Sequence, residues 1–309
     1  MNQLDISIII VNWNTRELLL ECLESIFQTV KEVSFEVWLV DNASTDGSVE
    51  SAKDQYPDIN VIQNEQNIGF AAANNLAFKQ MKGSYALLLN SDATLINNAA
   101  EELFNFMEAN HKAGIACGQL LNTDGSRQNS IANYPSLLSM LFNQGVLRIL
   151  FPNKFPSKRR KYTAPIEVDS CIGACMIVRK EAMDEVGILD EKYFFFLEET
   201  DWAYRMKQAG WKNYFVPAAR IFHAQGKSVG KSANKKIMFY RSRYYFFKKW
   251  YTRSYIIIYA AVFIRLLANT LLSLAGVLLT LGLNQRTKKR FVIYIQLILW
   301  HFRGCPINS

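Results

Sequence analysis

Short apolar runs alternate with amphipathic segments along the first third of the chain. The run Ile6–Asn12 is dominated by apolar, β-branched residues, which is typical of a strand buried on both faces. From Thr15 to Thr29 the apolar residues recur at helical spacing. The same alternation predicts strands at Val37–Val40, Asn60–Gln63, Tyr85–Leu89 and Ile115–Leu121, and helices at Gly47–Gln55, Phe70–Met81 and Ala99–Ala109. Strands that alternate with helices indicate an α/β fold, with a mostly parallel, doubly wound sheet and helices on both faces.

The middle of the chain is less regular. The basic stretch from Pro152 to Pro165 is expected to form a surface loop. Regular patterns return with a strand pair at Val168–Arg179, broken near Gly173. We then expect a helix from near Glu199 to before Gly210, short strands at Lys212–Val216 and Arg220–His223, and a basic, aromatic helix at Ser232–Tyr251.

The last part of the chain is different in character. Tyr255–Leu283 is almost entirely apolar, and a second apolar run, Phe291–Trp300, follows a basic segment. Leu266–Leu283 has 18 residues without a charge, near the lower limit for a transmembrane helix, and both of its flanks are basic. We expect helices that lie in the cytoplasmic membrane interface or dip into it, with Lys and Arg at anionic head groups. The alternative is an amphipathic helical layer that packs on the rest of the protein.

Charge is divided unevenly along the chain. Half of the 309 residues are hydrophobic, which excludes a disordered or low-complexity protein. Up to Asp201 the net charge is −11, whereas the residues after Asp201 include 19 Lys and Arg and no carboxylate. An acid-free segment of this size predicts an anionic partner. Because its basic residues are interleaved with long apolar runs, a phospholipid surface is favoured over nucleic acid.

Polar side chains follow the predicted strands at their carboxyl ends, where open parallel sheets bind ligands. Asp41 and Asp92 come directly after apolar strands, before any helix cap is needed, which favours a ligand role. One or two carboxylates with open water positions suit a divalent cation that bridges phosphates. Asn12 follows the first strand, and a ligand role and a role as the cap of the next helix are equally consistent with this position.

Several common sites are excluded. The chain has no dinucleotide-binding G-x-G-x-x-G after its first strand, no P-loop and no G-x-S-x-G nucleophile motif. Cys171 and Cys175 lack a second pair at metal-binding spacing, which favours packing. Five cysteines without regular spacing are typical of a reduced, cytosol-facing protein rather than a disulfide scaffold.

Five segments in order carry a family resemblance. They are VDNASTDGS (Val40–Ser48), NIGFAAANN (Asn67–Asn75), LLLNSDATL (Leu87–Leu95), IGACMIVRK (Ile172–Lys180) and LDEKYFFFLEETDWAYRMKQAG (Leu189–Gly210). Together they resemble family 2 glycosyltransferases of the GT-A fold, in particular the rhamnosyltransferase-like branch. The resemblance implies a catalytic domain at residues 1–250 and a hydrophobic, basic, helical appendage at residues 251–309 that associates with the membrane.

The resemblance also implies a site for the donor nucleotide and its metal. The family's Asp-x-Asp metal motif matches Asn90-Ser91-Asp92, which leaves Asp92 as the main carboxylate for Mg²⁺ or Mn²⁺. His223 matches a histidine that lies near the metal or diphosphate in relatives. Many relatives have Arg-Asn where this chain has Asn74-Asn75, which puts a direct phosphate contact there in doubt. The residues implied around the donor nucleotide are Asn12, Asp41, Asn67, Gly69, Asn75 and Asn90.

The catalytic base is implied at an acidic pair. The family places it at the second residue of Glu-Asp, which corresponds here to Glu199, and Glu198 is the alternative. A carboxylate in this position would deprotonate the acceptor hydroxyl as it attacks the anomeric carbon. Gly173 and Ala174 are small enough to allow close approach of a sugar. Asp201 is the last residue of the acidic cluster and is expected near the acceptor, and a carboxylate at this position also suits the N-terminus of a helix.

The expected function is that of an inverting glycosyltransferase in cell-surface glycan synthesis. It would move a sugar, with L-rhamnose as the candidate, from a dTDP or UDP donor to a lipid-linked or polysaccharide acceptor. The expected location is the cytoplasmic face of the plasma membrane. Because Asn90 and Glu199 depart from the commonest pattern, an inactive or regulatory nucleotide-sugar-binding homologue is the alternative. Two further functions are less favoured. A nucleotidyltransferase would need a Gly-rich triphosphate loop after the first strand, which this sequence does not supply. A nucleic-acid-binding protein would need a solvated basic groove, whereas the basic residues here are interleaved with apolar runs.

Overall fold

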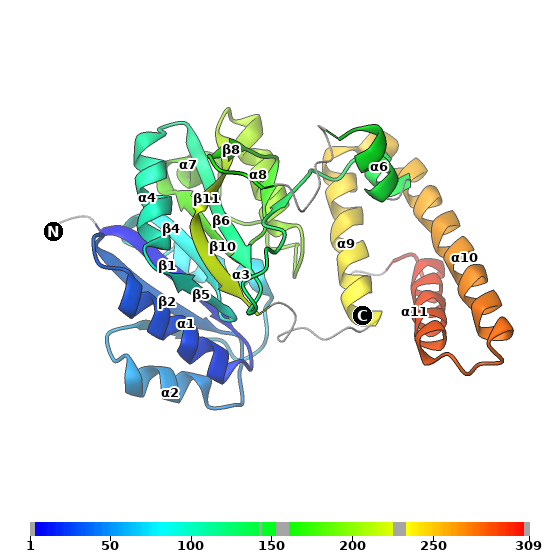
Figure 1. Cartoon of the computed structure of the whole chain (residues 1–309), viewed down its shortest axis with the longest axis horizontal. Coiled ribbons are helices and arrows are strands. Elements are labelled where there is room, and N and C mark those ends of the chain that lie inside the picture. The colour runs from blue at the N-terminus through cyan, green and yellow to red at the C-terminus, as the bar shows by residue number, and fades with distance from the viewer. Residues whose placement is uncertain (1–3, 142–143, 153–160, 225–232, 306–309) are drawn as a thin grey trace. The chain divides into compact units, whose positions relative to one another are not determined.

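The computed structural model describes residues 4–141, 144–152, 161–224 and 233–305, which form two compact units (Figure 1). The first unit contains the described residues within 1–134 and 158–228. The second contains those within 135–157 and 229–309. Most of the basic stretch at 152–165 lies outside the described residues.

A mixed, mostly parallel sheet forms the centre of the first unit. Its strand order is β3-β2-β1-β4-β10-β6-β11-β5, and β8 also pairs with β11. β1 is parallel to β2 and β4, β2 to β3, and β6 to β11, whereas β10 is antiparallel to both β4 and β6. The strands are β1 (Leu4–Asn12), β2 (Phe35–Asp41), β3 (Asn60–Gln63), β4 (Gly83–Asn90), β5 (Ala93–Ile96), β6 (Ala113–Leu121), β8 (Ile166–Glu167), β10 (Cys175–Arg179) and β11 (Lys212–His223).

Helices cover both faces of this sheet, as the alternating pattern predicts. Helices α1 (Arg16–Thr29), α2 (Ser48–Gln55) and α4 (Ala99–Ala109) share one hydrophobic core with Ile8 and Ile10. Helices α3 (Phe70–Phe78), α7 (Lys180–Val186) and α8 (Glu198–Gln208) share the other core with Ile9. Successive strand residues point to opposite faces, so a continuously apolar strand supplies both cores.

The structure corrects the sequence analysis in the second half of this unit. Residues 212–223 form one long strand, β11, whose register with β6 shifts between Val216 and Arg220, rather than two strands. The strand pair expected at Val168–Arg179 is divided between two sheets, because β9 (Ser170–Cys171) pairs with β7 (Ile131–Ala132) while β10 joins the main sheet. Strand β5 and helix α7 have no counterpart in the sequence prediction. The resulting order brings the C-terminal ends of β4, β6 and β11 and the start of β10 to one edge of the sheet.

The second unit is helical. Its buried core includes Met140, Tyr244, Leu266 and Trp300. The second apolar run forms a longer helix than expected, because Asn284 caps it ahead of the basic residues by accepting hydrogen bonds from Arg286 N and Thr287 N. The helices are α5 (Leu137–Leu141), α6 (Gln144–Leu150), α9 (Ala233–Trp250), η1 (Thr252–Ser254), α10 (Tyr255–Leu279) and α11 (Gln285–Phe302). The structure groups α9 with α10 and α11, and a functional boundary at residue 250 stays a prediction.

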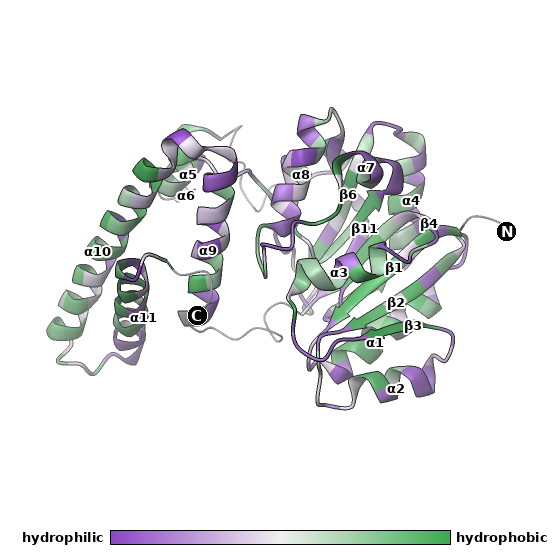
Figure 2. Ribbon diagram, turned by 180° about the vertical axis from the view of Figure 1, so that it is seen from behind, coloured by the Kyte–Doolittle hydropathy of each residue, from purple (hydrophilic) through white to green (hydrophobic). Residues whose placement is uncertain are grey.

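Within the described residues, one helical stretch, Thr252–Leu279, is long and apolar enough to cross a membrane, with a mean hydropathy of 2.0 over a window of 18 residues. Hydrophobic residues follow one another along α10 (Figure 2). Leu272 and Leu279 are 72% and 86% exposed within the protein, so much of this apolar surface is not used by the fold.

Candidate functional site

The loops that follow β1 and β2 are joined by buried polar side chains. Asn12 Nδ2 donates to Asp41 Oδ1 at 2.9 Å and to Ser44 Oγ at 3.0 Å, and Ser44 N donates to Asp41 Oδ2 at 2.8 Å. Asp41 is 2% exposed. Each of its oxygens therefore accepts one internal hydrogen bond and keeps a second lone pair. The structure brings Asn12 and Asp41 together, and their contact with a nucleotide stays a prediction.

The same two loops hold unusual backbone conformations. Asn14 and Ala43 have φ values of 53° and 62°, in the left-handed region that costs energy for residues other than glycine. Asn14 is held there by the bond from its N–H to Ser44 Oγ and by the one that its Oδ1 accepts from Thr45 N. Strained backbone of this kind persists where the surrounding structure fixes it, and it clusters at binding sites.

The turn before α3 lies against the segment that leads to the acidic pair. Gly69 N donates to Asn67 Oδ1 at 3.0 Å, and Phe70 N donates to Phe194 O at 2.9 Å. Gly69 has a φ of +87°, and a Cβ added to it would lie 2.6 Å from Phe194 O. Only glycine allows this approach.

Asn75, in the second turn of α3, also contacts the segment that leads to the acidic pair. Its Nδ2 donates to Leu189 O and Glu191 Oε1, each at 2.9 Å, and its Oδ1 accepts from Leu189 N at 3.1 Å. Both amide hydrogens are thus used inside the protein. The structure assigns Asn75 to holding residues 189–191 against α3, while its predicted role at the donor stays a prediction.

Asp92 and His223 meet where β4 and β11 end. Asp92 Oδ1 lies 3.3 Å from His223 Nε2, and the two residues are 7% and 8% exposed. Asn90, two residues before Asp92, is anchored through its N–H to Ala174 O at 2.9 Å. The structure therefore brings together residues that are more than 100 positions apart in the sequence.

Gln128 determines which nitrogen of His223 carries a proton. Its Nε2 donates to the backbone carbonyl of His223, and its Oε1 lies 3.0 Å from His223 Nδ1. Because a carbonyl only accepts, the amide orientation is set, and Nδ1 must be the donor. The Nε2 lone pair of a neutral imidazole then faces Asp92. An imidazole lone pair and a carboxylate at this distance repel each other unless a proton or a metal cation lies between them.

This pair suits a divalent metal that is completed by its substrate. Within the described residues, no group of three or more His, Cys, Asp or Glu side chains could hold a metal. Asp92 and His223 offer one carboxylate and one imidazole, which leaves coordination positions for phosphate oxygens and water.

The acidic pair begins helix α8 after a strained turn. Phe196 and Leu197 have φ values of 73° and 67°, and Glu198 and Glu199 follow directly. Among the described residues, Oε2 of Glu198 and Oε2 of Glu199 are buried without a hydrogen-bond partner. Buried polar atoms without a partner are uncommon in proteins, and a catalytic role is one of the explanations for them.

Burial changes the acidity of this pair. Loss of hydration raises the pKa of Glu199 from 4.5 to about 7. Burial and then the neighbouring charge of Glu199 raise the pKa of Glu198 well above its usual value. A carboxylate with a pKa near neutrality is suited to accept and release protons.

Gly173 lies over the side chain of Glu199. A Cβ at Gly173 would lie 3.7 Å from Cβ and Cγ of Glu199, which is an ordinary van der Waals contact, so the two residues are neighbours. Asp201 is different, because it is fully buried and accepts from Arg205 Nε at 3.1 Å and Tyr193 OH at 3.3 Å. The structure gives Asp201 a role in holding the start of α8, and its predicted place in the acceptor pocket stays a prediction.

Two polar contacts in the site have no counterpart in the sequence analysis. One is Gln128, which holds His223. The other is the bond between Thr15 Oγ1 and Ser91 Oγ, 2.8 Å long, which joins the first loop to the segment before Asp92. Sequence patterns do not indicate these contacts, because each depends on side chains that the fold brings together from distant parts of the chain.

Comparison with known proteins identifies the family of the chain. The model of glycosyl transferase family 2 matches residues 7–187. A relative, the N-acetylglucosaminyl-diphospho-decaprenol L-rhamnosyltransferase of Mycobacterium tuberculosis, is 28% identical over 68% of this chain and 73% of its own length. A low-salt glycan biosynthesis hexosyltransferase of Haloferax volcanii is 24% identical over 66% of this chain and 62% of its own length.

A solved structure supports the fold. The crystal structure of GalNAc-T7 with UDP, GalNAc and Mn²⁺ superposes with a TM-score of 0.59 and 19% identity. The match covers 80% of this chain and spans half the length of that one. It shows the GT-A architecture predicted from the sequence motifs. The family match covers more than half of the chain, and the protein therefore belongs to glycosyl transferase family 2.

Proposed function

We propose that this glycosyltransferase inverts the anomeric centre as it transfers a sugar, with L-rhamnose as the candidate, from a dTDP or UDP donor to a lipid-linked acceptor. The observation that carries the proposal is the acidic pair Glu198–Glu199, in which Oε2 of each residue is buried without a partner and the pKa of Glu199 is raised. The mycobacterial relative, whose name specifies a diphospho-decaprenol acceptor, supports the acceptor class.

In the proposed reaction, Glu199 accepts the proton of the acceptor hydroxyl. The acceptor oxygen then forms a bond to the anomeric carbon, while the bond from that carbon to the diphosphate oxygen breaks on the opposite face. The nucleoside diphosphate leaves with that electron pair. A neutral-range pKa allows Glu199 to be ionised before the step and to release the proton to solvent afterwards.

Asp92 and His223 would hold Mg²⁺ or Mn²⁺ in this proposal. When bound, the cation neutralises the charge that develops on the leaving diphosphate. The fit rests on the tautomer of His223, whose Nε2 lone pair is directed at Asp92 by Gln128. Asn12 and Asp41 would contact the nucleotide from the β1 and β2 loops, with Asn67, Gly69, Asn75 and Asn90 shaping the same edge.

The second unit would hold the enzyme at the cytoplasmic face of the membrane. Thr252–Leu279 supplies the exposed apolar surface, and the acid-free segment supplies positive charge for anionic head groups. This placement would bring a lipid-linked acceptor to the catalytic unit.

The test is donor turnover by the purified protein. UDP- and dTDP-sugars are incubated with Mn²⁺ and an N-acetylglucosaminyl-diphospho-lipid, and release of nucleoside diphosphate and glycolipid product is followed. The proposal predicts transfer with the donor's α-linkage becoming β, or the reverse, and loss of transfer in Asp92→Asn. Binding of nucleotide sugars without transfer or hydrolysis would instead support a regulatory homologue.

A further inference from the structure

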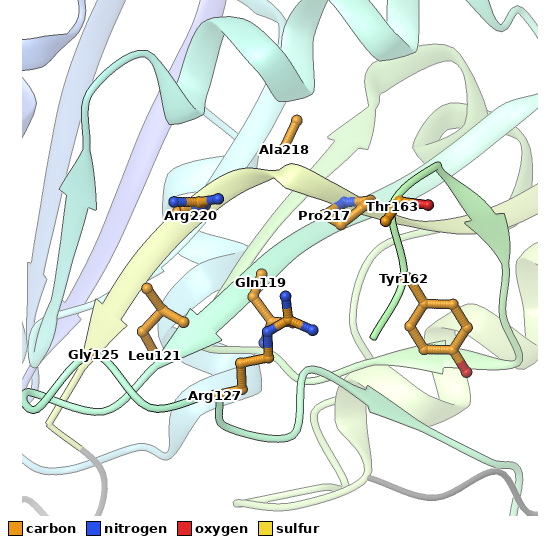
Figure 3. Close-up of a pocket in the computed structure, with 9 residues that line it drawn as sticks. All are labelled: Gln119, Leu121, Gly125, Arg127, Tyr162, Thr163, Pro217, Ala218 and Arg220. Atoms are coloured by element: carbon orange, nitrogen blue, oxygen red, sulfur yellow. The ribbon is translucent and has the colours of Figure 1, made fainter. Parts of the chain in front are cut away.

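A pocket of about 450 Å³ opens beside β6 and β11 in the first unit, and the roles proposed above do not use it (Figure 3). Two arginines, Arg127 and Arg220, line it together with Gln119 and Tyr162, and none of its lining residues is acidic. Its volume falls within the usual range for small-ligand sites. The pocket therefore combines space for a ligand with two positive charges.

The backbone fixes both arginines. Arg127 pairs with Leu121 at the base of a tight hairpin that turns at Asn122–Gly125, where Gly125 N donates to Asn122 O at 2.9 Å. Arg220 lies within β11 and is paired with Gln119 on one side and Ile96 on the other. Figure 3 shows Arg220 on β11 and Arg127 on the segment after the hairpin, both among the residues that line the pocket. Their Cα positions are thus held by sheet and hairpin bonds.

Neither guanidinium is neutralised by the protein. In the part of the chain that the structure describes, no hydrogen bond, ion pair or ring contact is made by the side chain of Arg127 or of Arg220. Five N–H donors on each remain available, in the planar arrangement that matches phosphate oxygens.

The pocket lies on the same face of the sheet as the acidic pair. Leu120 and Ile221 point into the core under α1 and α4, so their neighbours Gln119 and Arg220 point to the opposite face. Tyr162 on the pocket wall stacks edge-on with Phe215, which belongs to that second core, as does Trp202 of α8. The acceptor side of the site and the pocket are therefore on one side of the sheet.

The pocket is also connected to the Asp92–His223 pair but separate from the nucleotide loops. Gln119 Nε2 donates to Gln128 O at 3.0 Å, and Gln128 holds His223. Strands β4 and β10 lie between β6 and the loop after β1, so roughly three inter-strand spacings, about 14 Å, separate the two places along the sheet. A ligand in this pocket would lie beside the reaction centre without occupying the nucleotide site.

We infer that Arg127 and Arg220 bind the diphosphate of a lipid-linked acceptor, so that the sugar attached to it faces Glu199. This inference rests on the proposed function, because it names the charged part of the acceptor for the same reaction. It requires an anion of the phosphate class on the acceptor, which a neutral glycan would not supply.

The test compares two acceptors in steady-state kinetics with the full chain. One is N-acetylglucosamine linked through diphosphate to a farnesyl chain, and the other is octyl N-acetylglucosaminide, which has no phosphate. Arg127→Ala and Arg220→Ala should each raise KM for the diphosphate acceptor roughly tenfold or more, and leave KM for the octyl acceptor and for the donor unchanged. Lys112→Ala removes one exposed charge at the other end of β6 and should change none of these values.

Three results would overturn the inference. The first is an unchanged KM for the diphosphate acceptor in the double variant Arg127→Ala/Arg220→Ala. The second is an equal rise in KM for both acceptors. The third is a rise in KM for the donor, which would assign the pocket to the donor diphosphate. If the wild-type protein transfers sugar to neither acceptor, the proposed function fails and the pocket is tested alone. Calorimetric titration with inorganic pyrophosphate in EDTA should then show binding that the double variant loses, and absence of binding to the wild type would refute the site.

Discussion

The imidazole of His223 faces the carboxylate of Asp92 across 3.3 Å, with Gln128 holding the ring from its other side. A neutral imidazole in this tautomer presents its lone pair to a negative charge, so the arrangement is stable when a cation is shared between the two groups. The proposed cation is the metal that accompanies the donor diphosphate. In the proposed metal site, Asp92 and His223 would be the ligands and Gln128 would position the imidazole.

Removing either His223 or Gln128 should weaken this metal site. We expect His223→Ala and Gln128→Leu each to raise the Mn²⁺ concentration for half-maximal activity roughly tenfold or more, as changes around metal ligands usually do. In Gln128→Leu, saturating Mn²⁺ should restore most of kcat, because the ligands remain. A loss of kcat that excess Mn²⁺ does not restore would show that Gln128 supports the fold rather than the metal.

Gly69 should be indispensable for the segment before the acidic pair. Gly69→Ala adds a methyl group 2.6 Å from Phe194 O at a φ of +87°, so we expect a loss of about 2–3 kcal/mol in the free energy of unfolding and a lower kcat. Gly125→Ala is the matched control, because Gly125 also has a positive φ, +78°, but nothing lies within 4 Å of its added Cβ. Urea denaturation of both variants measures the difference. Equal losses would mean that the contact with Phe194 is unimportant.

Activity should depend on the ionisation of Glu199. Because burial raises its pKa to about 7, the carboxylate is mostly protonated at pH 6 and mostly ionised at pH 8. A base works only when ionised, so kcat/KM should rise with pH through a midpoint near 7. The measurement is a pH–rate profile in constant ionic strength, with donor binding followed separately. A profile that is flat from pH 5.5 to 8.5 would exclude Glu199 as a base with this pKa.

Membrane binding should depend on the exposed face of α10. Leu272→Glu combined with Leu279→Glu places two charges on side chains that are 72% and 86% exposed, so the fold should be retained. We expect binding to phosphatidylglycerol vesicles in a flotation assay to fall roughly tenfold. Gln55→Glu combined with Gln80→Glu makes the same change in net charge on the first unit and should bind as the wild type does. Unchanged flotation of the Leu272 and Leu279 variant would remove α10 from the membrane contact.

The sequence predicts the parallel half of the fold well, for a physical reason. Runs such as Ile8–Val11 and Tyr85–Leu89 are apolar at every position because both faces of each strand are covered by helices. Short strands give weaker signals. β5 has four residues of mixed character, and it becomes a strand because β11 reaches it, with Arg220 paired to Ile96.

The site is predictable only where a residue type matches a motif. The motifs single out Asp92, Glu199 and His223 as candidates, and their roles stay predictions. The motifs cannot indicate Gln128, because its contact with His223 depends on the hairpin that brings it back beside β11. The motifs also do not determine the roles of Asn75 and Asp201. An amide or a carboxylate at the end of a strand or helix can bind a ligand or form a hydrogen bond within the protein, and the sequence pattern is the same in both cases. In the structure, both side chains are used by internal hydrogen bonds.

Glu199 is proposed as the base, and the most direct test is the rate of sugar transfer in a single turnover by Glu199→Gln and Glu198→Gln. Glutamine keeps the size of the side chain and removes the buried charge, so both variants should fold at least as stably as the wild type near pH 8. We predict that Glu199→Gln lowers the rate of transfer by roughly a thousandfold with donor binding intact, within the range typical of a lost general base, while Glu198→Gln lowers it far less. Normal turnover in Glu199→Gln, with loss of turnover in Glu198→Gln, would contradict the assignment.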